Sequence, residues 1–255
     1  MIRVVFNRKG GVGKSTITCN LSAAAAQRGR KVLVVDIDSQ ANSSAYLQID
    51  GDDDIIGMPE FFESCITFNY SQFKPENYVR KTRFDNLHLI SSHGGLSDLE
   101  QKLESRHKIY KLRDFLNEHA KDFDEIYIDT PPAYNFYSLS ALIAADRVLI
   151  PFDCDEFSRE ALKDLLFNIR EVREDHNAGL EIEGIVINQF QSRARFPREA
   201  VESLQDFGIP VLQPYLSSSV RIRESHRAAK PMVFYDGSHK LSREFRELYE
   251  NLGNQ

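Results

Sequence analysis

A glycine-rich loop near the N-terminus separates an apolar segment from a helix-forming one, and this order is compatible with few folds. Residues 2–6 (IRVVF) are a short apolar run, and residues 9–15 read KGGVGKS. Residues 16–28 (TITCNLSAAAAQR) are rich in alanine and end before Gly29, a residue type common just after helix ends. The segment therefore predicts a strand, a loop and a helix in direct succession.

The same alternation of apolar runs and helix-forming segments continues along the chain. Residues 31–38 (KVLVVDID) complete a βαβ unit, whose parallel strands are typically buried on both faces. We expect further strands at residues 87–91, 125–129, 147–152, 182–190 and 209–213. We expect helices at about 96–120, 137–145, 158–176 and 197–207. Seven strands with intervening helices predict a doubly wound α/β fold with a mostly parallel sheet.

Length and composition indicate one domain over residues 1–255. The chain is 42% hydrophobic and 27% charged, as in ordinary soluble globular proteins. Residues 50–86 contain Asp52-Asp53-Asp54 and scattered aromatics without a clear period, so we expect an irregular excursion with one or two short helices. No apolar run approaches 18 residues and the N-terminus lacks the order of a signal peptide, so we expect a cytoplasmic protein.

The glycine loop has the composition of a phosphate-binding site. The glycines at 10, 11 and 13 let backbone N–H groups approach an anion, and the helix beginning near Lys14 directs its positive end to the same place. In such a P-loop, Lys14 neutralises the β and γ phosphates of a nucleotide and the Ser15 hydroxyl ligates magnesium. A glycine turn with a surface lysine is the simpler interpretation, and the position between strand and helix disfavours it.

A second element has to hold the metal. Asp129 ends the predicted strand 125–129, where a carboxylate reaches the carboxyl edge of the sheet. Asp36 and Asp38 end the adjacent strand, so three carboxylates converge near one phosphate site, an arrangement that is repulsive without a cation. The alternative is that Asp129 merely forms a turn at the strand end. The predicted magnesium ligands are Ser15, Asp36 and Asp129.

The order of three motifs resembles the ParA/MinD family of deviant Walker ATPases. The motifs are KGGVGKS, VDIDSQAN at 35–42 and YIDTPP at 127–132. The likeness continues through residues 87–103, 182–190 and 220–236 and is strongest to the small, Soj-like ParA partition ATPases. It implies a P-loop NTPase fold, ATP and Mg²⁺ as cofactors and slow ATP hydrolysis.

The resemblance also implies roles for single residues. Lys9 matches a lysine that contacts the nucleotide of the other subunit in an ATP-dependent homodimer, and a cation there offsets charge in phosphoryl transfer. Asp38 matches the residue that positions the attacking water, which makes Lys9 and Asp38 the predicted catalytic pair. Asn188 matches a position that touches adenine. The predicted nucleotide-binding residues are Gly10, Gly11, Val12, Gly13, Lys14, Ser15, Thr16 and Asn188.

Two positions depart from the family pattern. Arg8 stands where glutamine or a small residue is common, and its role is not explained by the resemblance. Residues 216–218 read Leu-Ser-Ser where Soj-like proteins have Ile-Pro-Arg near the base. The resemblance therefore does not predict contacts from that loop to the base.

A basic segment near the C-terminus indicates DNA binding. The net charge is −6, but residues 190–246 hold ten lysines and arginines against six aspartates and glutamates. Phosphate contacts by such a patch are independent of sequence. By resemblance Arg193 and Arg221 match DNA-binding positions, and the predicted DNA-binding residues are Arg193, Arg195, Arg221 and Arg223. A solvated helix face is the alternative.

Residues 241–252 decide between DNA and a membrane as the binding surface. Leu241, Phe245, Leu248 and Leu252 fall on one helical face. A MinD-like membrane helix has a lysine-rich polar face, whereas arginine and glutamate alternate here. We therefore expect a helix docked on the core and no stable membrane association.

The resulting hypothesis is an ATP-driven positioning switch. The ATP-bound dimer binds DNA non-specifically on the nucleoid, and a ParB-like or other adaptor stimulates hydrolysis to position a plasmid, a chromosome region or a protein assembly. One alternative is a MinD-like membrane-associated regulator of division or of flagellar or chemotaxis placement. Another is a metabolic ATP-dependent ligase or a metal-cluster carrier, although Cys19, Cys65 and Cys154 form no C-x-x-C motif.

Overall fold

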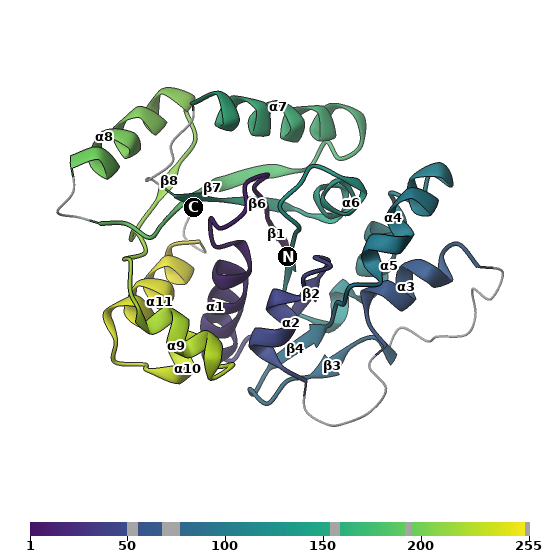
Figure 1. Ribbon diagram of the computed structural model, residues 1–255, viewed down its shortest axis with the longest axis horizontal. Helices are drawn as coiled ribbons and strands as arrows, with labels where there is room; N and C mark the ends of the chain where they lie inside the picture. The colour runs from purple at the N-terminus through teal and green to yellow at the C-terminus, as the bar shows by residue number, and fades with distance from the viewer. Residues whose placement is uncertain (50–55, 68–76, 154–158, 192–194, 253–255) are drawn as a thin grey trace.

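A mostly parallel sheet runs through the protein with helices on both faces (Figure 1). The structure is a computed structural model and describes residues 1–49, 56–67, 77–153, 159–191 and 195–252. Within these ranges eight strands form one sheet in the order β3-β4-β2-β5-β1-β6-β7-β8. The strands are β1 (Ile2–Val5), β2 (Val32–Asp36), β3 (Arg80–Lys81), β4 (Leu87–Ile90), β5 (Glu125–Asp129), β6 (Arg147–Asp153), β7 (Glu181–Asn188) and β8 (Val211–Leu212).

The seven predicted strands are all present, and the doubly wound α/β fold is confirmed. The sheet has one further strand, β3, which pairs antiparallel to β4 at its edge. With two residues β3 is too short to produce an alternating pattern in the sequence. All other pairs in the sheet are parallel.

The helices form two layers with separate hydrophobic clusters. The C-terminal helices lie beside α1 (Lys14–Gln27) on one side of the sheet, whereas α7 (Arg159–Asp175) lies on the other side (Figure 1). The first layer consists of α1 (Lys14–Gln27), α2 (Asn42–Leu47), α9 (Arg221–Arg227), α10 (Met232–Tyr235) and α11 (Lys240–Leu252). The second consists of α3 (Met58–Ser64), α4 (Leu96–Ser105), α5 (Lys111–His119), α6 (Phe136–Ala144), α7 (Arg159–Asp175) and α8 (Arg195–Leu204).

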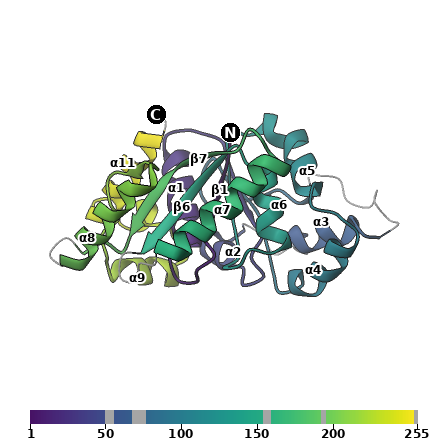
Figure 2. The same ribbon diagram turned by 90° about the horizontal axis from the view of Figure 1, so that it is seen from above.

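The prediction of one helix over 96–120 is wrong in its continuity. The chain forms α4 and α5 with a turn between them, where His107 has a φ of 54°. This left-handed conformation ends a helix. Helix α4 then packs on α3 and also contacts α6, whereas α5 packs on α6, and Figure 2 shows α5 and α6 side by side. Each half is amphipathic, so the sequence pattern alone does not mark the break.

Other helices differ less from expectation. The short helix expected within residues 50–86 is α3, while Asp52, Asp53 and Asp54 lie outside the described residues. Helices α2, α9 and α10 have four to seven residues and were not predicted. They are too short for a helical period to be visible.

Helix α1 is buried along most of its length, which fixes the loop that precedes it. Its alanines at 23–26 are at most 3% exposed, and the helix packs between the sheet and α11. Small side chains allow this close approach. On the sheet, Val4 and Val5 are both fully buried because helices cover both faces. The loops after β1, β2, β5 and β7 therefore meet at one rigid edge of the sheet.

Candidate nucleotide-binding site

The loop between β1 and α1 has a conformation that requires glycine. Gly11 and Gly13 have φ values of 79° and 93°. A Cβ atom on Gly13 would lie 2.2 Å from the Asn188 amide nitrogen. That nitrogen, at the end of β7, donates to the Val12 carbonyl at 2.9 Å. The structure thus brings Asn188 onto the glycine loop, from a strand 175 residues further along the chain.

Lys14 is directed back across the loop. Its side chain is largely buried, and its Nζ donates to the Lys9 carbonyl at 2.8 Å. Burial lowers the pKa of Lys14, and the charges of Asp129 and Asp38 oppose that effect. The ammonium group therefore lies beside the glycine loop, where a phosphate-binding lysine is expected, and also near the predicted carboxylates.

Asn7 is a residue of this site that the sequence reasoning missed. Its side-chain oxygen accepts the Lys9 N–H at 3.0 Å, and its amide donates to the Pro151 carbonyl at 2.7 Å. Asn7 thereby ties the loop to the end of β6. An asparagine directly after an apolar strand is a common turn residue, and this was the only signal available in the sequence.

The three predicted carboxylates converge, as expected from their positions at strand ends. Asp36 and Asp129 are fully buried and Asp38 is 5% exposed. Burial, together with the charge of Asp129, raises the pKa of Asp36 to about 8. Burial also raises the pKa of Asp129 to about 6, although the Ser15 and Ser43 hydroxyls act to lower it. A nearby cation would therefore stabilise the ionised form of these carboxylates.

Two serines at the start of α2 hold these carboxylates, and neither was predicted. The Ser43 hydroxyl donates to Asp129 Oδ2 at 2.7 Å. The Ser44 N–H and hydroxyl donate to Asp36 Oδ2 at 2.8 and 2.7 Å. The short helix α2 is thus attached directly to the ends of β2 and β5. The pair of serines after the VDIDSQAN motif was the signal that could have indicated this.

The residues present fit a magnesium ion. Asp129 Oδ1 is buried and accepts no hydrogen bond from any described residue, while the Ser15 hydroxyl lowers the pKa of this carboxyl. Both oxygens of Asp36 already accept hydrogen bonds, from Ser44 and from the Asp38 N–H. Magnesium usually takes one or two protein oxygens and completes its shell with water and phosphate. Ser15 and Asp129 suit that role, and no cluster of three acidic, histidine or cysteine ligands occurs in the described ranges.

A cavity of about 380 Å³ lies beside the glycine loop. Gly11, Gly13 and Thr16 form one side, and the loop of residues 217–219 with part of α9 forms the other. Glu244 of α11 holds that loop, since its carboxylate accepts the Ser217 N–H at 2.8 Å and the Ser217 hydroxyl at 2.7 Å. The loop that departs from the family pattern therefore still borders the cavity.

Lys9 and Arg8 lie toward α7. Lys9 is partly buried and borders a small hollow that it shares with Phe152 and Leu165. The Arg8 guanidinium donates to the Asn168 side chain at 3.5 Å. Arg8, which the family pattern does not explain, therefore contacts helix α7.

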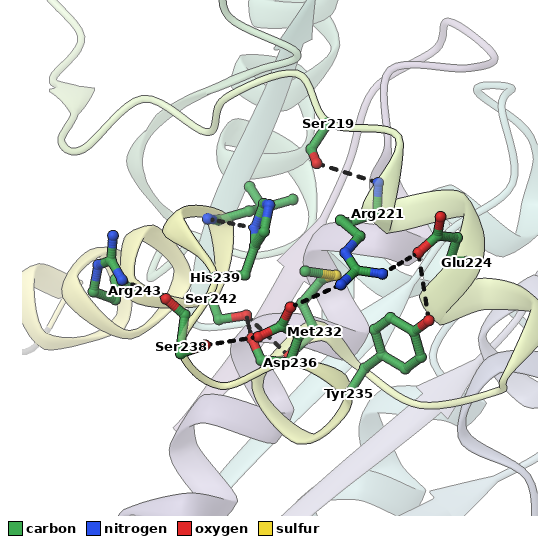
Figure 3. A network of polar contacts seen from close by, with 11 residues as sticks. Ser219, Arg221, Glu224, Met232, Tyr235, Asp236, Ser238, His239, Ser242 and Arg243 are labelled. Atoms are coloured by element: carbon green, nitrogen blue, oxygen red, sulfur yellow. Dashed lines mark hydrogen bonds and ion pairs between the residues drawn. The ribbon is translucent and has the colours of Figure 1, made fainter.

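The predicted DNA-binding arginines have different surroundings. Arg221 forms ion pairs with Glu224 at 2.6 Å and with Asp236 at 3.4 Å (Figure 3). Arg223 is exposed and lines the cavity. Arg193 lies outside the described residues, and of Arg195 only the backbone, as the first residue of α8, is described.

The prediction that residues 241–252 form a helix docked on the core is confirmed. Leu241, Phe245, Leu248 and Leu252 are at most 5% exposed and pack with α1 in one cluster. Glu244 is also buried, although the alternation of arginine and glutamate suggested a polar face. Within the described residues, no helix combines the length and apolar character needed to cross a membrane.

A parallel sheet with a glycine loop after its first strand and aspartates after β2 and β5 defines the class of P-loop nucleotide-binding proteins. Comparison with known proteins narrows the class. A model of the AAA domain family matches residues 1–182. The chromosome partitioning protein ParA of Myxococcus xanthus is 33% identical, over 91% of this chain and 80% of that protein. This chain belongs to the ParA/MinD family of ATPases.

Solved structures with the same fold carry further information. The cell division ATPase MinD of Pyrococcus furiosus is 27% identical with a TM-score of 0.78, covering 99% of this chain and 98% of that one. Cobyrinic acid a,c-diamide synthase of Mycobacterium smegmatis is 25% identical with a TM-score of 0.83, covering 99% and 94%. The latter structure contains an ATP analogue and magnesium.

Proposed function

We propose that this protein is a magnesium-dependent ATPase that positions a cargo. The observation that carries the proposal is the convergence of Lys14, Ser15 and Asp129 at the carboxyl edge of the sheet. The glycine loop and Lys14 would bind the phosphates, and Ser15 with Asp129 would hold magnesium, with Asp36 supporting the site from beside it. Bound magnesium would neutralise charge on the phosphate oxygens. The relatives named for partitioning and cell division support the positioning role.

Asp38 is the proposed residue for orienting the attacking water. Its side chain is 5% exposed, and its Oδ1 accepts the Gln40 N–H at 3.0 Å, which restricts the carboxylate. An oriented carboxylate next to the phosphate site can align water without being a strong base. Slow turnover is expected, because a switch has to persist in its ATP-bound state.

We further propose that Lys9 acts in a homodimer, on the ATP of the partner subunit. Its backbone is fixed from both sides, by Asn7 and by Lys14, at the outer end of the glycine loop. The experiment is sedimentation velocity with MgATP, together with an ATPase assay. Lys9→Ala should remain monomeric and lose hydrolysis, although it still binds ATP.

Arg8→Ala is the matched control, because it removes the neighbouring positive charge and, among the described residues, a contact to Asn168. We expect this variant to dimerise as the wild type does. If Lys9→Ala dimerises and hydrolyses ATP like the wild type, the role of Lys9 in the partner site is wrong.

The DNA-binding part of the proposal concerns Arg193, Arg195 and Arg221. Arg221 already pairs with Glu224 and Asp236, so its free charge is reduced, and we expect its removal to weaken DNA binding less than removal of Arg193. Each lost phosphate contact should lower the salt dependence of binding by about one unit of slope. The measurement is binding to an arbitrary duplex across a salt series, with ATP hydrolysis retained.

Arg170→Ala, which removes an exposed arginine from α7, is the control for this series. It should bind DNA like the wild type. Equal binding by Arg193→Ala and wild type at low salt would remove the DNA claim. An adaptor of the ParB type on the cargo, and association with the nucleoid, follow from the same proposal.

Two other functions are tested against this one. A MinD-like membrane regulator needs an exposed amphipathic segment, and the apolar face of α11 is already packed on α1. Co-sedimentation with liposomes and ATP would reveal membrane binding.

The likeness to the diamide synthase supports an ATP-dependent ligase as the second candidate. Turnover stimulated by DNA with an adaptor favours positioning, whereas turnover that depends on a small acid and an amine donor favours the ligase.

A further inference from the structure

Helix α9 distributes its charged side chains over two sides. Arg221 and Glu224 lie one turn apart, pair with each other and lie toward Tyr235 and Asp236 of the neighbouring segment (Figure 3). Residues 222, 223 and 226 line the cavity beside the glycine loop instead. Residues three or four apart share a helix face, so this division follows from the geometry of the helix.

Arg223 brings a positive charge to that cavity. In the described part of the chain its guanidinium makes no hydrogen bond and no ion pair, unlike that of Arg221. Residues 217–219, which line the same side of the cavity, contribute hydroxyl groups without charge. Desolvation lowers the pKa of His226, which disfavours a charge on its ring. Among the described residues that line the cavity, Arg223 is thus the side chain with a permanent positive charge.

His226 attaches α9 to the first turn of α1. Its Nε2 lies 3.1 Å from the Thr16 hydroxyl, and its ring stacks on Tyr46 with centroids 4.0 Å apart. The Tyr46 hydroxyl lies 2.7 Å from the Ser225 hydroxyl and adds a second link. These contacts hold the segment that carries Arg223 at a set position relative to the glycine loop.

We propose that Arg223 contacts the phosphate chain of the nucleotide bound by its own subunit, and that it contributes to nucleotide affinity rather than to DNA binding. The inference rests on the proposed function only in that a nucleoside polyphosphate occupies the glycine loop. Backbone N–H groups of the loop and a helix N-terminus already favour an anion at one side of the cavity. A guanidinium at the other side suits phosphate oxygens through its several fixed donors.

The test measures MgADP and MgATP-analogue binding by calorimetry in the absence of DNA. Arg223→Ala should weaken both by about tenfold, the effect of losing one partly exposed charged hydrogen bond. Arg223→Lys should recover part of the affinity, because the charge is kept and the fork of donors is lost. Arg227→Ala removes an exposed arginine from the same helix; it is the matched control and should bind within about twofold of the wild type.

The outcomes separate this inference from the proposed function. If the wild type binds no nucleotide, the proposed function fails and the inference fails with it. If the wild type binds and Arg223→Ala binds equally well, only the inference is overturned. Unchanged nucleotide affinity with weakened DNA binding would return Arg223 to the DNA-binding set. Arg223 is exposed, so its variants should unfold at the same urea concentration as the wild type.

Discussion

Gly13 is enclosed by Asn188 and has a left-handed backbone, so a side chain there is excluded twice over. We predict that Gly13→Ala lowers the free energy of unfolding by about 1–3 kcal/mol and abolishes nucleotide binding. Urea denaturation without nucleotide measures the first effect. Gly10→Ala is the control, since within the described ranges its Cβ would meet Pro132 alone, at an ordinary 3.8 Å. Equal losses in the two variants would contradict the explanation.

Asp36 makes the stability of the nucleotide-free protein depend on pH. Burial raises the pKa of its carboxyl from 3.8 to about 8, so between these values the unfolded chain releases this proton and the folded chain retains it. The stabilising contribution is complete below about pH 4 and is lost as the pH rises toward 8. We predict that the free energy of unfolding falls by about 1–2 kcal/mol from pH 6.5 to 8 without magnesium.

The variant Asp36→Asn should flatten this dependence, because the residue no longer titrates. Urea midpoints of both proteins at several pH values provide the measurement. Parallel curves for wild type and variant would show that another group is responsible. Magnesium with nucleotide should weaken the dependence in the wild type, since a cation favours the ionised carboxylates.

At the scale of elements, α11 supports the far side of the cavity. Glu244 accepts two hydrogen bonds from Ser217, and its loss would leave the Ser217 N–H without this partner. We predict that Glu244→Ala lowers the free energy of unfolding by about 1–3 kcal/mol and weakens nucleotide binding. Thermal unfolding with and without MgADP measures both effects. Glu247→Ala, exposed on the same helix, should leave them unchanged; similar losses in both would sink the idea.

The elements also show what pattern reasoning detects. Buried parallel strands are continuous apolar runs, and the seven expected strands form where helices on both faces of the sheet bury these runs. Short helices such as α2 and α9 are not detected from the sequence. They have too few residues to show a helical period, and packing stabilises them. The break between α4 and α5 is not detected either, because both helices are amphipathic and the apolar pattern continues across the break.

At the scale of the whole molecule, a buried polar network joins the sheet to α11. Arg3 of β1 pairs with Glu183 of β7 at 2.8 Å and with Glu125 of β5. Glu125 in turn accepts hydrogen bonds from the hydroxyls of Tyr127, at 2.8 Å, and Tyr249, at 2.6 Å. Burial alone would lower the pKa of Arg3, but these neighbours raise it.

Removing one partner of this network should be costly. We predict that Arg3→Met lowers the free energy of unfolding by about 3–5 kcal/mol, because the buried Glu183 and the partly buried Glu125 are left without their cation. Adding Glu183→Gln should recover part of the loss. Arg170→Ala, which breaks an exposed pair with Glu174, should change stability by less than about 1 kcal/mol. A comparable loss for the exposed pair would contradict the burial argument. Urea unfolding compares all three variants.

The sequence by itself determined the alternation of strands and helices, the glycine loop and the positions of Asp36, Asp38 and Asp129 at strand ends. These features are local, because they depend on side-chain period and on backbone conformations that glycine favours. The tertiary structure decided what each polar group contacts. It placed Asn188 on the glycine loop, Ser43 on Asp129 and Glu244 on Ser217, across separations of 176, 86 and 27 residues.

The arginines of α9 show the same distinction most clearly. Arg221 and Arg223 lie close together in a basic segment of the sequence, and both were assigned to DNA, Arg221 also by its match to a DNA-binding position. In the fold, Arg221 neutralises Glu224 and Asp236, while Arg223 lines the cavity beside the glycine loop. Two residues apart on a helix, the side chains point in different directions, and only the packing of α9 against α1 and α10 decides what each direction meets.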